Sequence, residues 1–382
     1  MNNNRIKSTN SNYKICFLAP HLSTGGMPAF LLKRIQTLLK YTEVEIFVVE
    51  WCDYSPTFIV QKQQIKKLVG DNFLNIGSID NTESGIHGSK EDFIDFLYKN
   101  KIDIIHVEEI PEGFDHFNPF TKKIQKEIYD KKHPWRVVET CHNMYFNPDK
   151  DKVYSPDGYA CVTSHHVNNT FKNQKSSKSL IPFPIDPSIQ YKGKKDDLLN
   201  EIGYRLKGEF HIVNIGLWTP GKNQSHALNI AKKLYDKYGF TYIFHFVGNQ
   251  APNFKEYWEP LMSDLPPNVN IWGERNDVEK FFKFSDLMLF TSNWECNPIV
   301  LKEAISNNIK IMAYDLEHYG DEYKPYIVPL NGDINTDSDT LINTIFTPIK
   351  YDVNDSRDNS SDFAIKHINF YKSLLDEKTK RQ

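Results

Sequence analysis

The sequence alternates short apolar runs with amphipathic stretches, and this rhythm constrains the fold more than any other feature. Residues 14–19 form a continuous apolar run, as expected of a strand that is buried on both faces of a parallel sheet. The segment after it places apolar side chains at helical spacing on one face, namely Leu31, Leu32, Ile35, Leu38 and Leu39. Further strands are predicted at residues 44–49, 73–76, 102–107, 137–140 and 159–162, with a helix at 58–68. This repetition predicts an α/β sheet with helices on both faces.

Three prolines in residues 181–187 interrupt the pattern, and a stretch rich in Lys and Asp follows, as expected at a domain boundary. The alternation then starts again, with strands predicted at residues 211–215, 242–247, 269–272, 287–290 and 309–313 and helices at 223–238, 278–284 and 298–307. We therefore predict two doubly wound, Rossmann-like domains that face each other across a cleft. The N-terminal domain is expected to span residues 13–185 together with a last helix in 361–382, and the C-terminal domain residues 186–360.

Composition argues against several classes of protein. Lys and Arg total 46 and Asp and Glu total 49, so the net charge of -3 gives no general attraction to nucleic acid. No apolar run approaches the ~20 residues of a spanning helix. Residues 1–12 lack the apolar core of a signal peptide and are expected to be a disordered leader. The five cysteines are scattered without metal-ligand spacing, which favours a cytoplasmic protein with reduced thiols.

The sharpest local signal is the strand-to-helix junction at residues 290–304. Asn297 is expected to cap a helix that begins at Pro298, because proline at a first helical position loses no hydrogen bond. The free N–H groups at the start of such a helix attract phosphate. Glu295 and Glu303 flank this anion site, which suits a ligand that also carries hydroxyls. The pattern therefore favours a nucleotide sugar, with a diphosphate for the helix and hydroxyls for the carboxylates.

Each half also has a glycine-bearing turn between a predicted strand and a helix. Gly25 and Gly26 let a phosphate or sugar approach the backbone, although many such turns use glycine for geometry alone. In the second half Gly216 is followed by Lys222 at a helix start, which suits a diphosphate; a solvated lysine is the plainer alternative. Neither turn is a G-x-G-x-x-G fingerprint or a Walker A loop, so a dehydrogenase is not favoured.

Histidines at two places in the sequence are candidates for chemistry. His142 follows the predicted strand 137–140, where an imidazole can donate to a phosphate or sugar oxygen, or can be structural. His165 and His166 have no cysteine or third histidine at metal spacing, so a zinc site is not predicted.

Together these features resemble a retaining glycosyltransferase of the GT-B fold, in the group often called family 4. The family's Glu-x7-Glu-Ala pattern stands here as Glu295 to Glu303 followed by Ala304, after the run 285–292. Further matches follow in the right order along nearly the whole chain: Gly25-Gly26, His142, Pro184-Ile185-Asp186, Gly216 with Lys222, Phe246-Val247-Gly248, and Gly273 before Asp277-Val278.

The resemblance implies a role for each of these positions. Lys222 would hold the donor diphosphate, Glu303 the ribose and Glu295 the transferred sugar. His142 would face the reacting centre and form the catalytic group with Lys222 and Glu295. The remaining donor-binding positions would be Gly25, Gly26, Gly216, Arg275, Cys296, Asn297, Pro298, Ile299 and Val300. A hexose would pass from a UDP- or GDP-linked donor to a glycan or lipid-linked acceptor with retention of configuration, without a cofactor or metal ion. The last helix would cross back onto the N-terminal domain.

Two positions differ from the family pattern. The family usually has Arg directly after the glycine of the Lys222 loop, and here that residue is Leu217. It usually has Gly after the first Glu, and here that residue is Cys296. The missing guanidinium removes one phosphate cation, for which Arg275 is the candidate replacement. A nucleotide-sugar-binding protein without turnover is therefore one alternative, and a nucleotide-sugar epimerase is another. A phosphorylase, which needs a pyridoxal cofactor and a longer chain, is disfavoured.

A basic face on the N-terminal domain is a further hypothesis. Its members would be Lys33, Arg34, Lys40, Lys122, Lys123, Lys126, Lys131, Lys132 and Arg136. Such a face can approach anionic lipid and would place the protein peripherally at a membrane. Ordinary solvated helix surfaces are the plainer interpretation.

Overall fold

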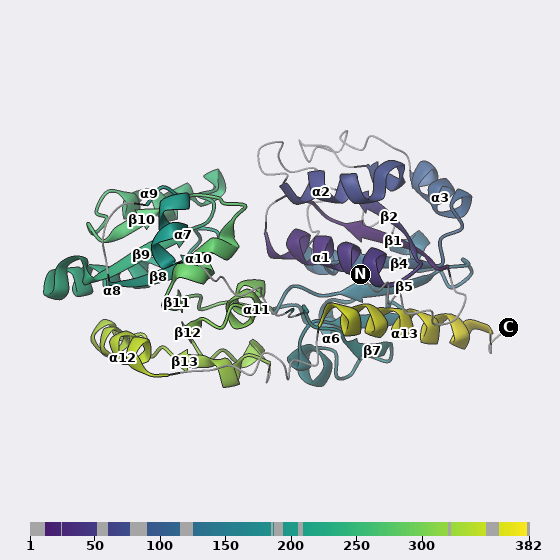
Figure 1. Cartoon of the computed structure of the whole chain (residues 1–382). Coiled ribbons are helices and arrows are strands. Elements are labelled where there is room, and N and C mark those ends of the chain that lie inside the picture. The colour runs from purple at the N-terminus through teal and green to yellow at the C-terminus, as the bar shows by residue number, and fades with distance from the viewer. Residues whose placement is uncertain are drawn as a thin grey trace. The chain divides into compact units, whose positions relative to one another are not determined.

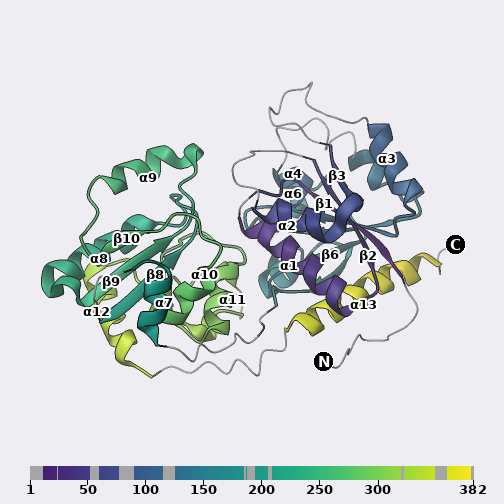
Figure 2. The same cartoon turned by 45° about the horizontal axis from the view of Figure 1, so that its top comes forward.

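The computed structural model describes residues 12–23, 25–51, 60–76, 90–114, 125–184, 186, 194–204, 209–319, 322–348 and 359–379. By its internal contacts the chain divides into two units, one of Met1–Pro184 with Asp358–Gln382 and the other of Ile185–Arg357. Each unit is a parallel sheet covered by helices (Figure 1 and Figure 2). Of the predicted disordered leader, only Asn12 lies within the described residues.

The first unit is built on seven parallel strands in the order β3-β2-β1-β4-β5-β6-β7. The strands are β1 (Lys14–Ala19), β2 (Glu45–Glu50), β3 (Phe73–Asn75), β4 (Ile104–Glu108), β5 (Arg136–Thr140), β6 (Gly158–Cys161) and β7 (Ser177–Leu180). β1 lies inside the sheet, and its apolar side chains are buried from Ile15 onward. Leu18 pairs with Val49 on one side and Val107 on the other, so the carboxyl ends of these strands meet at one edge.

The last helix of the chain packs on the first unit. The helices of this unit are α1 (Gly26–Tyr41), α2 (Val60–Val69), α3 (Lys90–Lys99), α4 (Pro111–Phe114), α6 (Pro148–Asp151) and α13 (Ser360–Thr379). α13 packs against α1 and β7 (Figure 1). Gly158 in β6 permits this approach, because a Cβ there would lie 2.5 Å from Phe370 Cζ and 3.2 Å from Leu374 Cδ1. The predicted return of the last helix to the N-terminal half is confirmed.

The second unit has six parallel strands in the order β10-β9-β8-β11-β12-β13. The strands are β8 (Phe210–Ile215), β9 (Tyr242–Val247), β10 (Val269–Ile271), β11 (Leu287–Phe290), β12 (Lys310–Ala313) and β13 (Ile327–Pro329). The helices are α7 (Lys195–Glu201), α8 (Gln224–Tyr238), α9 (Lys255–Met262), α10 (Val278–Phe284), α11 (Ile299–Ser306) and α12 (Ile334–Phe346). Successive residues of β8 face two apolar cores, because Val213 packs with α7, α10 and α11 and Ile212 packs with α8 and α12.

The predicted architecture of two doubly wound α/β halves is confirmed, although two strands were not predicted. Both of these strands lie at the edge of a sheet. β7 reads Ser-Lys-Ser-Leu and has no apolar run, and β13 reads Ile-Val-Pro and is too short for a periodic signal. Edge strands tolerate polar residues and proline, because one side of the backbone makes no ladder hydrogen bonds.

The ends of β8 and β9 approach closely at Gly216 and Gly248. The Gly216 N–H donates to the Val247 carbonyl (2.9 Å), and the Gly248 N–H donates to the Gly273 carbonyl (2.8 Å). Gly248 has a φ of 154°, and a Cβ at this position would collide with the Gly216 carbonyl group. The turn that carries Lys222 therefore depends on a glycine one strand away.

We expect Gly248→Ala to lower the free energy of unfolding of the second unit by about 2–4 kcal/mol, through backbone strain and overpacking. Urea unfolding of the full chain measures this change. Gly273→Ala is the matched control, because Gly273 also has a positive φ (65°) but has no atom within 4 Å of an added Cβ. The control is expected to lose only about 1 kcal/mol. Equal losses in the two variants would contradict the close-approach argument.

Candidate functional site

In the second unit, Lys222 lies in the loop between β8 and α8, and its side chain folds back over the end of the strand. The stem crosses Gly216, where an added Cβ would lie 3.6 Å from Lys222 Cδ. The Lys222 N–H donates to the Thr219 carbonyl (3.1 Å). The hydroxyl of Thr291, directly after β11, donates to the Lys222 carbonyl (3.1 Å). The loops that follow the neighbouring strands β8 and β11 are thereby tied together.

Lys222 forms an ion pair with Glu295 from the second of these loops. Its Nζ contacts Glu295 Oε1 and lies 5.4 Å from the centre of the Phe290 ring. The two side chains are 28% and 10% exposed, so the pair is partly open to solvent. The structure thus brings together two predicted site residues from separate motifs. A ligand phosphate can compete with the carboxylate for this cation.

The loop before Glu295 carries an exposed aromatic side chain that the sequence reasoning did not select. The Trp294 side chain is 49% exposed. Its ring lies against Gly221, where an added Cβ would be 3.1 Å from Trp294 Cε3. The Asn293 N–H donates to the Gly221 carbonyl (3.0 Å). Gly221 therefore lets the two loops lie in contact beside the Lys222–Glu295 pair.

Helix α11 starts one residue later than predicted, and its predicted N-cap residue, Asn297, is also wrong. Pro298 occupies the N-cap position with non-helical backbone angles, and the helix begins at Ile299 without a side-chain cap. Asn297 does not cap it, because its side-chain oxygen accepts a hydrogen bond from the Tyr323 hydroxyl (2.6 Å). A distant tyrosine thus removes the expected cap and leaves the first turn of the helix without a side-chain acceptor.

The other predicted donor-binding residues of this unit lie in two places, around the start of α11 and in the loop after β10. Cys296, Ile299 and Val300 are half-buried around the start of α11, and Glu303 is exposed on the same helix. The guanidinium of Arg275 donates two hydrogen bonds to the Asp277 carboxylate, from Nε to Oδ1 and from Nη2 to Oδ2, each 2.8 Å long. It lies in the loop after β10, which is separated from β8 by β9. Among the described residues, no contact joins Arg275 to the Lys222 loop.

In the first unit, Gly25 and Gly26 lie at the start of α1. Gly25 is the N-cap residue with a φ of 135°, and its carbonyl accepts a hydrogen bond from the Ala29 N–H (3.2 Å). Both glycines are exposed. The positive φ explains why Gly25 is a glycine, whereas Gly26 has ordinary helical geometry and no atom within 4 Å of an added Cβ.

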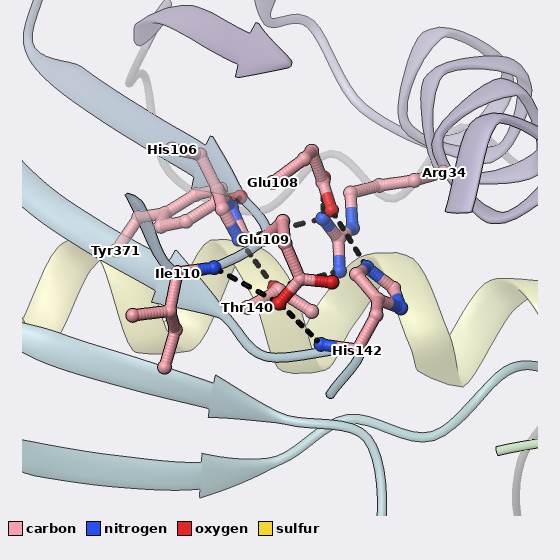
Figure 3. Close-up of polar contacts among 8 residues, drawn as sticks. All are labelled: Arg34, His106, Glu108, Glu109, Ile110, Thr140, His142 and Tyr371. Carbon is pink, nitrogen blue, oxygen red and sulfur yellow. Dashed lines mark hydrogen bonds and ion pairs between the residues drawn. The ribbon is translucent and has the colours of Figure 1, made fainter. Parts of the chain in front are cut away.

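His142 lies after β5, beside a buried polar cluster at the ends of β4 and β5 (Figure 3). Its Nε2 is 3.2 Å from Glu108 Oε2, and the other oxygen of Glu108 accepts a hydrogen bond from Arg34 Nη1. Arg34 Nη2 also donates to Thr140 Oγ1 (3.1 Å). The side chains of Arg34 and Glu108 have no exposed surface, whereas His142 is 14% exposed.

The cluster extends to the last helix of the chain. His106 Nε2 lies 2.7 Å from Thr140 Oγ1, and His106 Nδ1 lies 2.6 Å from the Tyr371 hydroxyl of α13. None of His106, Thr140 and Tyr371 was predicted as a site residue. The available signal was polar residues inside buried apolar strands, such as His106 and Glu108 in Ile-Ile-His-Val-Glu.

Arg34 cannot belong to the predicted basic face, because its side chain is buried within this cluster. Arg136 is also neutralised, because it pairs with Asp157 (3.2 Å), as does Lys131 (2.9 Å). Lys122 and Lys123 lie outside the described residues.

Burial decides the charge of His142. It lowers the pKa of this imidazole to about 3, with Arg34 and His166 adding to the effect. The carboxylate of Glu108 does not reverse this change, because Arg34 already balances its charge. His142 is therefore neutral at physiological pH. Burial also raises the pKa of the neighbouring Glu109 to about 7. Two backbone N–H groups donate to its carboxylate and lower the pKa, but their effect is smaller than that of burial.

The described residues include no cluster of three or more His, Cys, Asp or Glu side chains arranged to hold a metal ion. Within the same part of the chain, no helix has both the length and the apolar character needed to cross a bilayer.

Comparison with known proteins points to one family. Residues 201–332 match the family model described as Glycosyl transferases group 1. An uncharacterized glycosyltransferase of Methanocaldococcus jannaschii is 26% identical over 152 residues, which are 39% of this chain and 36% of that protein. An Escherichia coli UDP-Gal:alpha-D-GlcNAc-diphosphoundecaprenol alpha-1,3-galactosyltransferase is 25% identical over 178 residues, 44% of each protein. The chain thus spans less than half the length of these two relatives.

Solved glycosyltransferase structures share the fold over the whole chain. A glycosyltransferase from Rickettsia africae superposes with a TM-score of 0.66 at 14% identity, covering 95% of this chain and 99% of that one. Anabaena HepE in complex with UDP-glucose superposes with a TM-score of 0.62 at 12% identity, covering 96% and 98%. These likenesses confirm the GT-B fold that the sequence predicts.

The raised pKa of Glu109 predicts a pH-dependent stability. The folded state holds this proton up to about pH 7. An unfolded glutamate releases it near pH 4.5. The contribution of protonated Glu109 to the free energy of unfolding is therefore fully present below pH 4.5 and is lost as the pH rises through 7. We expect Glu109→Gln to remove about 1–2 kcal/mol of the stability difference between pH 5.5 and pH 8. Urea unfolding of wild type and variant at both pH values measures this; an identical pH dependence in the two proteins would refute it.

Proposed function

We propose that this chain, whose residues 201–332 belong to the glycosyl transferases group 1 family, is a glycosyltransferase. It would move a hexose-type sugar from a nucleoside-diphosphate sugar to a glycan or lipid-linked acceptor. The observation that carries the proposal is the Lys222–Glu295 pair, which lies where two neighbouring parallel strands of that domain end. The lysine supplies the compact cation that a diphosphate requires, and the carboxylate supplies an acceptor for sugar hydroxyls.

Donor binding would rearrange this pair. The diphosphate replaces Glu295 at Lys222, and the N–H groups at the uncapped start of α11 bind a second part of the same anion. The released carboxylate of Glu295 then accepts hydrogen bonds from the transferred sugar. Glu303, exposed on α11, accepts the two hydroxyls of the ribose.

A UDP-linked hexose is the favoured donor. Two of the similar proteins support this choice: the Anabaena HepE structure holds UDP-glucose, and the E. coli relative is named for a UDP-Gal donor. A GDP-linked donor is the alternative outcome of a donor screen.

The proposed reaction breaks the bond between the anomeric carbon and the diphosphate oxygen and forms a bond from the same carbon to the acceptor hydroxyl oxygen. The acceptor proton passes to the leaving phosphate on the same face, which retains the configuration. Lys222 and the start of α11 stabilise the charge that develops on the leaving diphosphate. We propose that this stabilisation requires no metal ion or cofactor.

A binding protein without turnover is the second candidate function. It is favoured by Leu217, which stands where the family usually has arginine, and by Arg275, whose guanidinium is already paired with Asp277. Lys222 is then the one cation that the described Gly216–Lys222 loop offers to a diphosphate.

A donor panel separates these functions. UDP-, GDP- and ADP-hexoses are incubated with the protein, with and without a chelator, and free nucleotide is measured. We expect turnover of one donor, unchanged by the chelator, and a fall in kcat/KM of about 10²–10³-fold in Lys222→Ala. The matched control is Lys232→Ala, an exposed lysine of α8 paired with Asp264, which should stay within about twofold of wild type. No turnover of any donor, with intact nucleotide-sugar binding, would support the binding protein.

The role of Glu303 is tested by nucleotide affinity. We expect Glu303→Ala to weaken binding of the active nucleoside diphosphate by about 10–100-fold, because a charged acceptor for the ribose diol is lost. Calorimetric titration measures the dissociation constant. Glu279→Ala, which removes an exposed glutamate of α10, is the control and should leave the affinity unchanged. Equal affinity in Glu303→Ala and wild type would exclude the ribose role.

A further inference from the structure

We propose that Glu108 and Arg34 form a positioning pair that fixes His142 as its Nε2–H tautomer, so that His142 Nδ1 accepts a hydrogen bond from a substrate hydroxyl. The inference rests on the proposed function for the identity of that substrate. It assigns a function to two buried residues that no family motif in the sequence includes.

The two oxygens of Glu108 are divided between two partners. Oε1 accepts from Arg34 Nη1, and Oε2 lies 3.2 Å from His142 Nε2 (Figure 3). Arg34 cannot turn away, because Nη2 is bonded to Thr140 and its guanidinium carbon lies 4.6 Å from the centre of the Phe30 ring. Phe30 also packs edge-on against the ring of His142, with the ring centres 5.3 Å apart. The carboxylate and the imidazole are therefore held in one arrangement.

Arg34 sets the direction of the hydrogen bonds around it. Glu108 forms an ion pair with this buried cation, and the positive charge of Arg34 favours the ionised, acceptor-only form of the carboxylate. His142 Nε2 must then carry the proton. The same logic applies to His106, whose Nε2 faces Arg34 Nη1 (3.4 Å) and Thr140, so that its Nδ1 carries the proton toward Tyr371. One buried cation thus imposes opposite tautomers on two histidines.

The remaining nitrogen of His142 gives the cluster its link to a ligand. Among the described residues Nδ1 of His142 has no hydrogen-bond partner, and the side chain is 14% exposed. Figure 3 shows this nitrogen turned away from Glu108. A neutral ring with its proton on Nε2 presents a lone pair at Nδ1, which binds hydroxyl donors and repels phosphate oxygens. This proposal differs from the sequence-based expectation, in which His142 donates to a phosphate or sugar oxygen, because here the ring accepts a hydrogen bond from a sugar hydroxyl.

Glu108→Gln tests the pair, because it inverts the tautomer without changing the shape of the side chain. Arg34 requires an acceptor, so the amide oxygen turns to Arg34 and the amide NH₂ turns to His142. Nε2 must then accept and Nδ1 must carry the proton. We expect the ¹⁵N signals of His142, assigned by their loss in His142→Gln, to exchange their protonated and unprotonated positions. Glu109→Gln removes the adjacent carboxylate, which bonds the backbone N–H groups of Ile110 and His142 but not the His142 ring, and should leave these ring signals unchanged.

Activity gives the second readout. With the active donor, we expect kcat in Glu108→Gln to fall about 10–100-fold, as the loss of a charge-assisted network implies. The affinity for the free nucleoside diphosphate should stay within twofold. If donor hydrolysis without acceptor falls equally, the hydroxyl belongs to the transferred sugar; if only transfer falls, it belongs to the acceptor. Either result supports the proposal that His142 Nδ1 accepts a hydrogen bond from a substrate hydroxyl.

Three results would overturn the inference. One is a wild-type spectrum in which His142 carries its proton on Nδ1, a measurement that needs no folded Glu108 variant. Another is an unchanged tautomer in folded Glu108→Gln. The third is an exchanged tautomer with unchanged kcat. A wild-type protein that turns over no donor but shows the Nε2–H tautomer would instead refute the proposed function and leave the positioning pair supported.

Discussion

Parallel strand pairing is the constraint on which both polar groups of this protein depend. In a parallel sheet the carboxyl ends of all strands lie on one edge, so loops far apart in the sequence become neighbours. β8 and β11 are adjacent although β9 and β10 lie between them in the chain, and their register pairs Ile212 with Leu287. The loops after these strands carry Lys222 and Glu295, which are brought together in this way. β4 and β5 bring Glu108 and His142 together in the same way.

The buried charge of Arg34 is costly unless its donors are satisfied, and the cluster satisfies most of them. Glu108 balances the charge, Thr140 accepts a second donor, and the aromatic ring of Phe30 covers one face. Replacing such a pair by apolar residues is often neutral or stabilising, so stability is a weak reason for its presence. A pair that sets the proton positions of two histidines has a more specific use, because hydrophobic residues cannot supply that direction.

Sequence patterns predicted the interior strands and several of the residues that follow them, and failed at the edge strands β7 and β13 and where a partner comes from a distant part of the chain. The apolar runs predict β1, β9 and β11 closely, and the motif around Glu295 identifies the loop that contacts Lys222. Arg34 was assigned to a basic surface together with Lys33 and Lys40, and α1 was expected to bury one face. α13 packs on α1 from the far end of the chain, and α1 buries Arg34 and Thr37 as well as Leu31 and Leu38, whereas Leu32 and Leu39 stay half-buried. Likewise, the expected cap at Asn297 is taken by Tyr323, a partner that local spacing does not reveal.

The two units use charge in opposite ways. In the second unit the Lys222–Glu295 pair is partly open to solvent, so its cation can change partners and meet a phosphate. In the first unit the charge of Arg34 is buried and balanced by Glu108. The partly exposed His142 ring, which contacts Glu108, is neutral and offers a nitrogen lone pair as a hydrogen-bond acceptor. An exchangeable cation selects an anion, whereas a neutral acceptor selects a hydroxyl.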